Sequence, residues 1–269
     1  MGVVNVTPDS FSDGGRWLDP GLAVEHGRRL LAEGADLVDV GGESTRPGAQ
    51  RPSVGEELDR VLPVIEHLVA EGARVSVDTM RASVAQAALS AGAVLVNDVS
   101  GGLADDQMYA VVARAGAPYV LMHWRAHARR MQEHATYDDV VVDVMRELTA
   151  ALEAAVGAGI DRSRIALDPG IGFAKTAEQN WDVLASMERF HDLGQPLLIA
   201  TSRKRFLGVL LADDQGTLRP PVLRDDATTA TSALAAAAGA WCIRTHSVRA
   251  TRDAVQVAGR WAAGSGADV

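Results

Sequence analysis

The sequence predicts an α/β fold, and within that class a single (β/α)8 TIM barrel. Short apolar runs rich in β-branched residues alternate with longer helical patterns almost from end to end of the 269 residues. This alternation requires a parallel sheet, because each helix must return the chain to the end where the previous strand began. About eight such units in roughly 250 residues match a closed barrel. A doubly wound open sheet is the alternative, but it usually has a Gly-rich turn after its first strand, and residues 5–9 read Asn-Val-Thr-Pro-Asp instead.

The eight expected strands are residues 2–6, 37–41, 74–78, 94–98, 119–123, 165–168, 197–202 and 241–245. The helices expected between and after them are residues 20–33, 54–70, 82–91, 106–115, 139–156, 178–193, 225–238 and 249–262. Several helices end at a glycine just before the next strand, as at Gly34, Gly92 and Gly116. Glycine adopts the left-handed conformation that terminates a helix there. No linker or low-complexity tract interrupts the pattern, so we expect one domain over residues 1–269.

Composition excludes several classes of protein. The net charge of −9 argues against a nucleic-acid surface, which needs a basic stripe, but it allows a local basic pocket for a small anion. The single cysteine, Cys242, excludes an internal disulfide framework and a multi-cysteine zinc site. The longest apolar stretch, residues 227–240, is too short to span a bilayer, and no leader pattern opens the chain. We therefore expect a soluble cytoplasmic protein that binds neither nucleic acid nor membrane.

Polar residues gather where the expected strands end, which is where a barrel of this type builds its active site. In the last strand, alternation places Cys242, Arg244 and His246 on one face. Asp, Asn, Ser and Thr at such positions can be ordinary helix caps. Cations cannot be explained in this way, because a positive charge at a helix start opposes the helix dipole. Arg46, Lys204 and Arg244 therefore indicate an anionic ligand.

These strand-end residues fall into two chemical sets. The first contains Asn5, Arg46, Arg244 and His246 and suits phosphate oxygens, with the Asn5 carbonyl also able to bind Mg²⁺. The second contains the acceptors Asp78, Asn97 and Asp168, with Lys204 beside them as a donor. Acceptors on several walls of a deep pocket suit a flat heterocycle rich in N–H groups, such as a 2-aminopyrimidinone. An acid–base pair of Asp78 and Asp168 is the alternative, although nothing in the sequence places these carboxylates together.

Two further patterns are interpreted as structural. The histidines at positions 123, 127 and 134 lie in a segment of mixed charge, and we expect surface side chains rather than metal ligands. Gly170-Ile171-Gly172 followed by Lys175 is similar to a phosphate-binding loop but lacks its Gly-Lys-Ser/Thr ending.

The whole pattern resembles the dihydropteroate synthase family. The segments that carry the resemblance run from the first strand to the last: residues 5–15 (NVTPDSFSDGG), 39–48 (DVGGESTRPG), 77–79 (VDT), 96–102 (VNDVSGG), 121–123 (LMH), 167–173 (LDPGIGF), 201–206 (TSRKRF) and 244–246 (RTH). The family resemblance implies a pterin-binding TIM barrel, a requirement for Mg²⁺ held by Asn5, and a homodimer built on late helices.

The resemblance also implies a role for each matching residue. The pterin ring would be bound by Asp78, Asn97, Asp168 and Lys204, with Met122 packed against it. The diphosphate would be bound by Asn5, Thr45, Arg46, Arg244 and His246. The p-aminobenzoate pocket would be formed by Thr7, Pro8, Phe11, Pro47, Phe173 and Ser202, with Asp9 in the loop that closes over it. The catalytic set would be Asp9, Arg46, Lys204, Arg244 and His246.

The reaction implied joins 6-hydroxymethyl-7,8-dihydropterin diphosphate to p-aminobenzoate and releases diphosphate. We expect a dissociative substitution, in which cations stabilise the leaving group and no side chain acts as nucleophile. One alternative is a methyltransferase that passes the methyl group of methyltetrahydrofolate to a corrinoid protein. That reaction releases no diphosphate and leaves Arg46 and Arg244 unexplained. The other alternative is a pterin-binding barrel without catalytic activity.

Overall fold

The expected strands form in the expected order. The computed structural model describes residues 1–7, 20–44, 51–127 and 134–264. In these ranges the strands are β1 (Gly2–Asn5), β2 (Val38–Gly41), β3 (Val75–Asp78), β4 (Leu95–Asp98), β5 (Tyr119–Met122), β6 (Ile165–Asp168), β7 (Leu198–Ile199) and β8 (Cys242–Ile243). Strands β1 to β5 are each one residue shorter than expected, β6 has the expected bounds, and β7 and β8 are reduced to two residues each.

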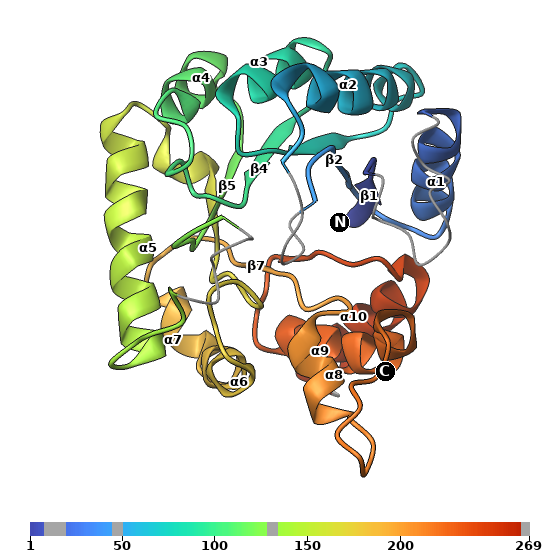
Figure 1. Cartoon of the computed structure of the whole chain (residues 1–269), viewed down its shortest axis with the longest axis vertical. Helices are drawn as coiled ribbons and strands as arrows, with labels where there is room; N and C mark the ends of the chain where they lie inside the picture. Colours follow the sequence, from blue (N-terminus) through green and yellow to red (C-terminus); the bar gives the residue numbers. More distant parts are fainter. Residues whose placement is uncertain (8–19, 45–50, 128–133, 265–269) are drawn as a thin grey trace.

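Backbone hydrogen bonds close these strands into a ring. Strands β1 to β6 form one parallel sheet in sequence order, and β7 pairs with β8. Bridges between Leu167 and Leu197, and between Gly2 and Thr245, join the two sheets at both edges. At the second junction the Val3 amide donates to the Thr245 carbonyl at 3.1 Å, and the Thr245 amide donates to the Met1 carbonyl at 3.0 Å. The predicted TIM barrel is confirmed, with its strands surrounded by helices (Figure 1).

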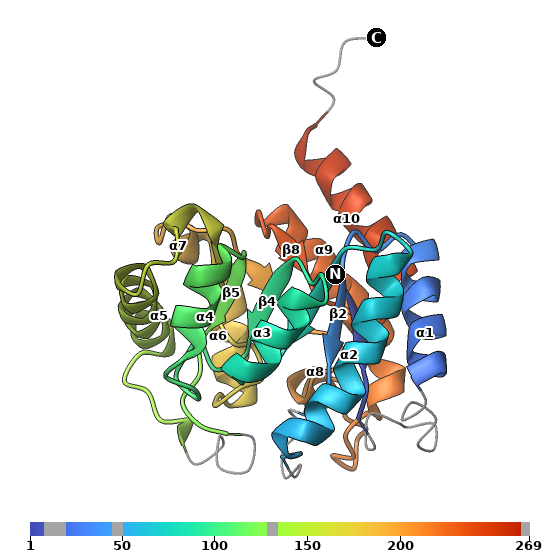
Figure 2. The ribbon, with the colours of Figure 1, turned by 90° about the horizontal axis from the view of Figure 1, so that it is seen from above.

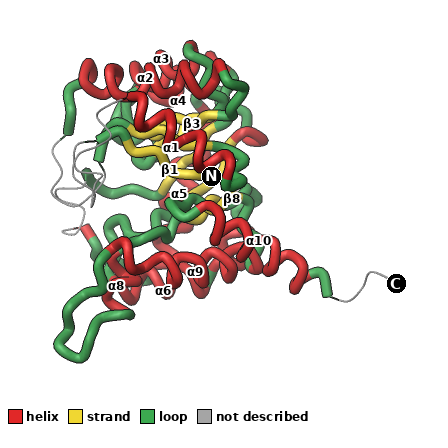
Figure 3. The backbone as a smooth tube through the Cα atoms, turned by 90° about the vertical axis from the view of Figure 1, so that its right-hand side faces the viewer, coloured by secondary structure: helices red, strands yellow, loops and turns green. Residues whose placement is uncertain are grey.

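Helices cover the outside of the barrel, while the strands occupy its centre (Figure 3). Those in the described ranges are α1 (Pro20–Ala32), α2 (Val54–Ala70), α3 (Ala82–Ser90), α4 (Met108–Ala115), α5 (Val140–Gly157), α6 (Ala177–Ala185), α7 (Met187–His191), α8 (Arg205–Leu210), α9 (Asp225–Ala237) and α10 (Val248–Ala262), with short 3₁₀ turns η3 (Arg162–Arg164) and η4 (Pro221–Arg224). Gly34, Gly92 and Gly116 have positive φ, as their role at helix ends predicts.

The prediction of one helix over residues 178–193 is wrong. The chain leaves the helical conformation at Ser186, which has φ −104° and ψ 18°, so that α6 and α7 are separate. The apolar periodicity continues across this break, because Val183 on α6 and Phe190 on α7 are both fully buried. Periodicity alone therefore could not reveal the break. Helix α8 and the turn η4 were not expected.

The apolar core has two layers. The larger one lies between the strands and the surrounding helices and includes Val38, Val75, Leu121 and Leu167. The smaller one fills the inside of the barrel with Met1, Leu95, Val120, Ala166, Leu198 and Ala200. Because side chains alternate along a strand, the residues two positions after this inner layer also face the barrel interior. They include Asn97, Met122, Asp168 and Ser202, so the inner core forms the base of the candidate site.

No helix in the described ranges has the length and apolar character needed to cross a bilayer. The longest, α5, has 18 residues and includes Asp143, Arg146, Glu147 and Glu153. The cytoplasmic location stays a prediction.

Candidate active site

Arg244 lies at the centre of a buried ionic group on one side of the barrel mouth. Its Nε donates to Oδ2 of Asp39 at 2.7 Å, and its NH2 donates to Oδ2 of Asp78 at 2.7 Å. The Asn97 side chain donates from Nδ2 to the same Asp39 oxygen at 2.8 Å. Asp39 and Asn97 are buried, and the Arg244 side chain is 17% exposed. Three neighbouring strands and β8 therefore supply one continuous polar floor.

Burial and neighbouring charges shift the pKa values of two groups in this floor, Asp78 and Arg244. Burial raises the pKa of the Asp78 carboxyl to about 7, although the Arg244 guanidinium opposes this shift. Burial also disfavours the charge on Arg244, but Asp39 and Asp78 outweigh it and hold the pKa of Arg244 above its ordinary value. Arg244 therefore stays charged and offsets part of the repulsion between the two buried carboxyl groups.

Asp168 and Lys204 stand on the opposite wall. Oδ1 of Asp168 accepts a hydrogen bond from the Gly170 amide at 2.7 Å. The Lys204 ammonium donates to the Ile171 carbonyl and lies 4.9 Å from the centroid of the Phe173 ring. Burial raises the pKa of the Asp168 carboxyl, and burial lowers the pKa of the Lys204 ammonium to about 8. The loop after β6 thus orients both the acceptor and the donor of this wall.

The Arg244 and His246 side chains have different partners. The Ser202 hydroxyl accepts a hydrogen bond from the His246 amide at 3.1 Å and lies 2.9 Å from Nδ1 of the same residue. His246 is therefore linked to the end of β7, whereas the Arg244 guanidinium reaches the carboxylates of β2 and β3. The expected contact of both residues with one diphosphate stays a prediction.

The remaining expected site residues are placed only in part. Asn5 ends β1 beside Gly41 of β2, and Thr7 is buried two residues later. Met122 is buried in a small cluster with Met80 and Val99, against which Phe173 packs. The other expected residues, Pro8, Asp9, Phe11, Thr45, Arg46 and Pro47, lie outside the described residues.

A second buried network was missed, and it corrects one expectation. His123 was expected at the surface, but it is only 3% exposed. The ammonium of Lys175 donates to Nδ1 of His123 at 3.1 Å and to the carbonyls of Gly170 at 3.1 Å and Phe173 at 3.3 Å. Because Nδ1 accepts, Nε2 carries the ring proton and donates to Glu147 at 2.8 Å.

Burial shifts both basic groups of this network toward neutrality. It lowers the pKa of His123 to about 4, with a further contribution from the Lys175 charge, and it lowers the pKa of Lys175 to about 7. Lys175 therefore fixes the loop after β6, the same loop that holds Asp168 and Lys204. The spacing of Lys175 after two glycines was the only local signal in the sequence. This spacing is similar to a phosphate loop but lacks its ending, and Lys175 instead binds carbonyl groups of its own loop.

The expectation that histidines 123, 127 and 134 form no metal site stays a prediction. Among the described residues, no three His, Cys, Asp or Glu side chains are grouped to hold a metal ion. His134 is exposed and His127 is half-buried.

Comparison with known proteins gives one consistent result. Residues 1–246 match the model of the family described as pterin binding enzymes. The chain is 54% identical over 262 residues to the dihydropteroate synthase of Mycobacterium leprae (strain TN), covering 97% of this chain and 92% of that protein. It is 44% identical over 250 residues to the dihydropteroate synthase of Bacillus subtilis (strain 168), covering 93% and 83% of the two chains.

Solved structures agree in fold. The dihydropteroate synthase of Xanthomonas albilineans with 4-aminobenzoic acid superposes with a TM-score of 0.89 at 45% identity and covers 100% of this chain and 93% of its own. The same enzyme in complex with 7,8-dihydropteroate gives 0.85 at 43% identity, with 100% and 94% covered. The Yersinia pestis dihydropteroate synthase in a sulfonamide drug complex gives 0.90 at 40% identity, with 96% and 92% covered.

Proposed function

The chain belongs to the family of pterin-binding enzymes, and on that premise we propose that it carries out the reaction of a dihydropteroate synthase. It joins 6-hydroxymethyl-7,8-dihydropterin diphosphate to p-aminobenzoate and releases 7,8-dihydropteroate and diphosphate. The observation that supports this assignment most is the 54% identity with the Mycobacterium leprae enzyme over 97% of this chain. The polar floor inside the barrel is consistent with it.

The pterin is held by the buried acceptors and donor of that floor. Asp78 and Asp168 accept from the ring N–H groups, Asn97 contributes its amide, and Lys204 donates to a ring carbonyl or nitrogen. Met122 packs against the ring. As the ring binds, its donors compete with Arg244 for Asp78, and the guanidinium keeps its contact with Asp39 while its free N–H groups turn to the leaving diphosphate.

The chemical step is a dissociative substitution at the pterin methylene. The C–O bond breaks first, and Arg46, Arg244 and His246, with Asn5 and Thr45, bind the departing diphosphate. The cation left on the methylene is delocalised into the ring and is favoured by the nearby Asp78 and Asp168. The arylamine attacks from a pocket formed by Thr7, Pro8, Phe11, Pro47, Phe173 and Ser202, which Asp9 and its loop cover.

Mg²⁺ fits the oxygen donor at the end of β1. This ion binds few protein ligands and prefers phosphate oxygens and water, so the side-chain carbonyl of the half-buried Asn5 would supply one ligand, with the diphosphate and water supplying the others. When bound, it offsets the negative charge that grows on the diphosphate.

A diphosphate-release assay tests the proposal. We expect release that requires both p-aminobenzoate and Mg²⁺, and a fall of about 10²–10³ in kcat/KM for Arg244→Ala because charge stabilisation of the leaving group is lost. Arg244→Lys should recover little of the lost kcat/KM, since lysine cannot bind two partners in the same plane. Methyl transfer to cobalamin would favour the corrinoid alternative. Tight pterin binding without turnover would favour a non-catalytic barrel.

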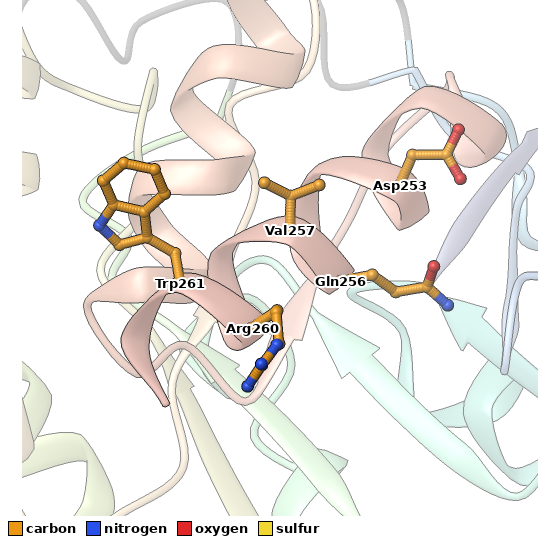
Figure 4. Close-up of a pocket in the computed structure, with 5 residues that line it drawn as sticks. All are labelled: Asp253, Gln256, Val257, Arg260 and Trp261. Carbon is orange, nitrogen blue, oxygen red and sulfur yellow. The ribbon is translucent and has the colours of Figure 1, made fainter. Parts of the chain in front are cut away.

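We also propose a homodimer formed on the outer face of α10. Val257 is 64% exposed and Trp261 is 85% exposed, and with Asp253, Gln256 and Arg260 they line a surface pocket (Figure 4). Leu234 on the adjacent α9 is 70% exposed. The end of α10 projects beyond the barrel (Figure 2). Exposed apolar side chains of this size on neighbouring helices are typical of a protein interface.

Light scattering coupled to gel filtration measures the assembly directly. The wild type is expected at twice the mass of one chain, and Trp261→Glu is expected to lower the mass toward one chain, because a charge replaces an apolar contact. Val94→Glu, at a position 41% exposed before β4, is the matched control and should leave the mass unchanged. A single-chain mass for the wild type would contradict the dimer.

A further inference from the structure

Asp39 lies one layer below the candidate site, on the same inner face of the barrel. It precedes Gly41 by two residues on β2, and Gly41 is in register with Asp78. The Asp39 side chain is fully buried. Its Oδ2 accepts both the Arg244 Nε and the Asn97 Nδ2, and its Oδ1 has no hydrogen-bond partner among the described residues. A buried carboxylate is energetically costly unless neighbouring groups donate hydrogen bonds to it, so its contacts with Arg244 and Asn97 are important.

The first consequence concerns the Asn97 amide. Oδ2 of Asp39 already accepts a hydrogen bond from the Arg244 guanidinium, so Asn97 must present its NH₂ group to this oxygen. The carbonyl oxygen Oδ1 of Asn97 then faces away from Asp39. Asn97 is in register with Asp78 on the neighbouring strand, so the two side chains lie on the same inner face of the barrel. Without Asp39, either end of the amide could face the ligand.

The second consequence concerns Arg244. Its guanidinium is held at two points, by Asp39 through Nε and by Asp78 through NH2. A ligand that displaces the contact with Asp78 leaves the contact with Asp39 in place. The guanidinium therefore keeps one anchor when the site is occupied.

We propose that Asp39 is a positioning residue that sets the hydrogen-bond polarity of the pterin floor, by fixing the Asn97 amide with its oxygen toward the ligand and by anchoring Arg244. This inference rests on the proposed function, because the ligand is taken to be a donor-rich pterin. Asp39 does not touch the ring in this arrangement; it acts through Asn97 and Arg244. It thereby favours a ring edge that carries N–H donors over one that carries carbonyl oxygens.

Direct binding tests the proposal separately from turnover. The probes are 6-hydroxymethylpterin and a pteridine-2,4-dione, in which a carbonyl replaces the 2-amino donor, and calorimetry gives both values of Kd. For Asp39→Ala, which removes the acceptor of both hydrogen bonds, we expect Kd for the pterin to rise at least tenfold and the preference for pterin over the dione to fall at least tenfold. Asp39→Leu carries the same expectation for selectivity if the Ala variant does not fold. Asp39→Asn should stay closer to the wild type, because its carbonyl oxygen can still accept both hydrogen bonds.

A matched control is available at the neighbouring strand end. Asp98 is also a fully buried carboxylate, but it accepts from Ser100, Gly102 and Tyr119 and not from the floor. Asp98→Asn should lower the melting temperature without changing the ratio of the two Kd values. In an Asn97→Ala background, Asp39→Ala should change selectivity by less than threefold, since the amide that Asp39 orients is absent.

Two outcomes overturn the proposal. One is an Asp39→Ala or Asp39→Leu variant that folds and keeps the wild-type ratio of the two Kd values. The other is an equal loss of selectivity in Asp98→Asn, which would reduce the effect to general stability. Neither depends on diphosphate release, so failure of the proposed reaction and failure of this inference give different results.

Discussion

Asp78 is the residue whose charge most directly depends on its surroundings. Burial raises its pKa to about 7, and the nearby Asp39 carboxylate adds to the effect, while Arg244 opposes it. A carboxyl with this pKa changes its charge within the ordinary working range of an enzyme. In its ionised form it accepts hydrogen bonds from a pterin ring, whereas in its protonated form it offers the ring a donor.

Pterin affinity should therefore depend on pH. Between pH 6 and pH 7 the ionised fraction of a carboxyl with pKa 7 rises about fivefold, and we expect the association constant to rise by about the same factor. The Asp78→Asn variant should bind more weakly and show no such rise over this range. Titration calorimetry with 6-hydroxymethylpterin at several pH values measures both curves. A rise of equal size in Asp78→Asn would assign the dependence to another group.

Lys204 should limit affinity on the alkaline side. Burial lowers its pKa to about 8, so its ammonium loses a proton as pH rises through that value. The donor that it offers to the ring is then neutral and weaker. The full profile for the wild type is therefore expected to be bell-shaped.

At the scale of elements, strand positions could be predicted because each strand has a local signal. The alternation of side chains placed Cys242, Arg244 and His246 on one face, and Cys242 indeed packs against the inner core. The six residues of α8 are too few to show a helical period, and that helix was missed. Partners were missed for a different reason. Asp39 and Arg244 are 205 residues apart, and no local pattern indicates that they meet.

A second network, formed by Lys175, His123 and Glu147, also joins residues that lie far apart in the sequence. Glu147 lies on α5, His123 follows β5, and Lys175 precedes α6. The Arg125 guanidinium also donates to Glu147, from Nε at 3.0 Å. Each Lys175 donor has an acceptor, so the loop after β6 is tied to the outer helix through buried hydrogen bonds.

Lys175→Met should change how stability depends on pH. The pKa of Lys175 is about 7 in the folded chain and 10.5 in its ordinary state. Between these values the unfolded chain binds more protons, so this group makes the free energy of unfolding rise with pH, by at most about 1.4 kcal/mol per unit. The variant lacks this contribution. Urea unfolding at pH 7, 8 and 9 should show the wild-type value rising relative to the variant, and parallel curves would contradict the assignment.

At the scale of the whole molecule, the ring of strands closes between β8 and β1. Gly2 lies at this junction, where its bridge to Thr245 connects the two ends of the barrel. A methyl group on Gly2 would lie 3.1 Å from Leu30 Cδ1 of α1 and 3.1 Å from Val248 Cγ2 of α10. Strand β1 therefore packs against both α1 and α10, and the absence of a side chain at Gly2 allows these helices to approach it closely.

Gly2→Ala tests whether this junction limits the stability of the barrel. The added methyl group must displace two buried side chains, so we expect a loss of about 1–3 kcal/mol in the free energy of unfolding. Gly55→Ala in α2 is the control, because a methyl group there meets no atom within 4 Å. Alanine favours a helix over glycine, so the control should gain about 0.5–1 kcal/mol. Urea unfolding measures the free energy of unfolding of both variants. If Gly2→Ala gains stability as Gly55→Ala does, the junction accommodates a methyl group, and close packing at Gly2 does not limit closure of the ring.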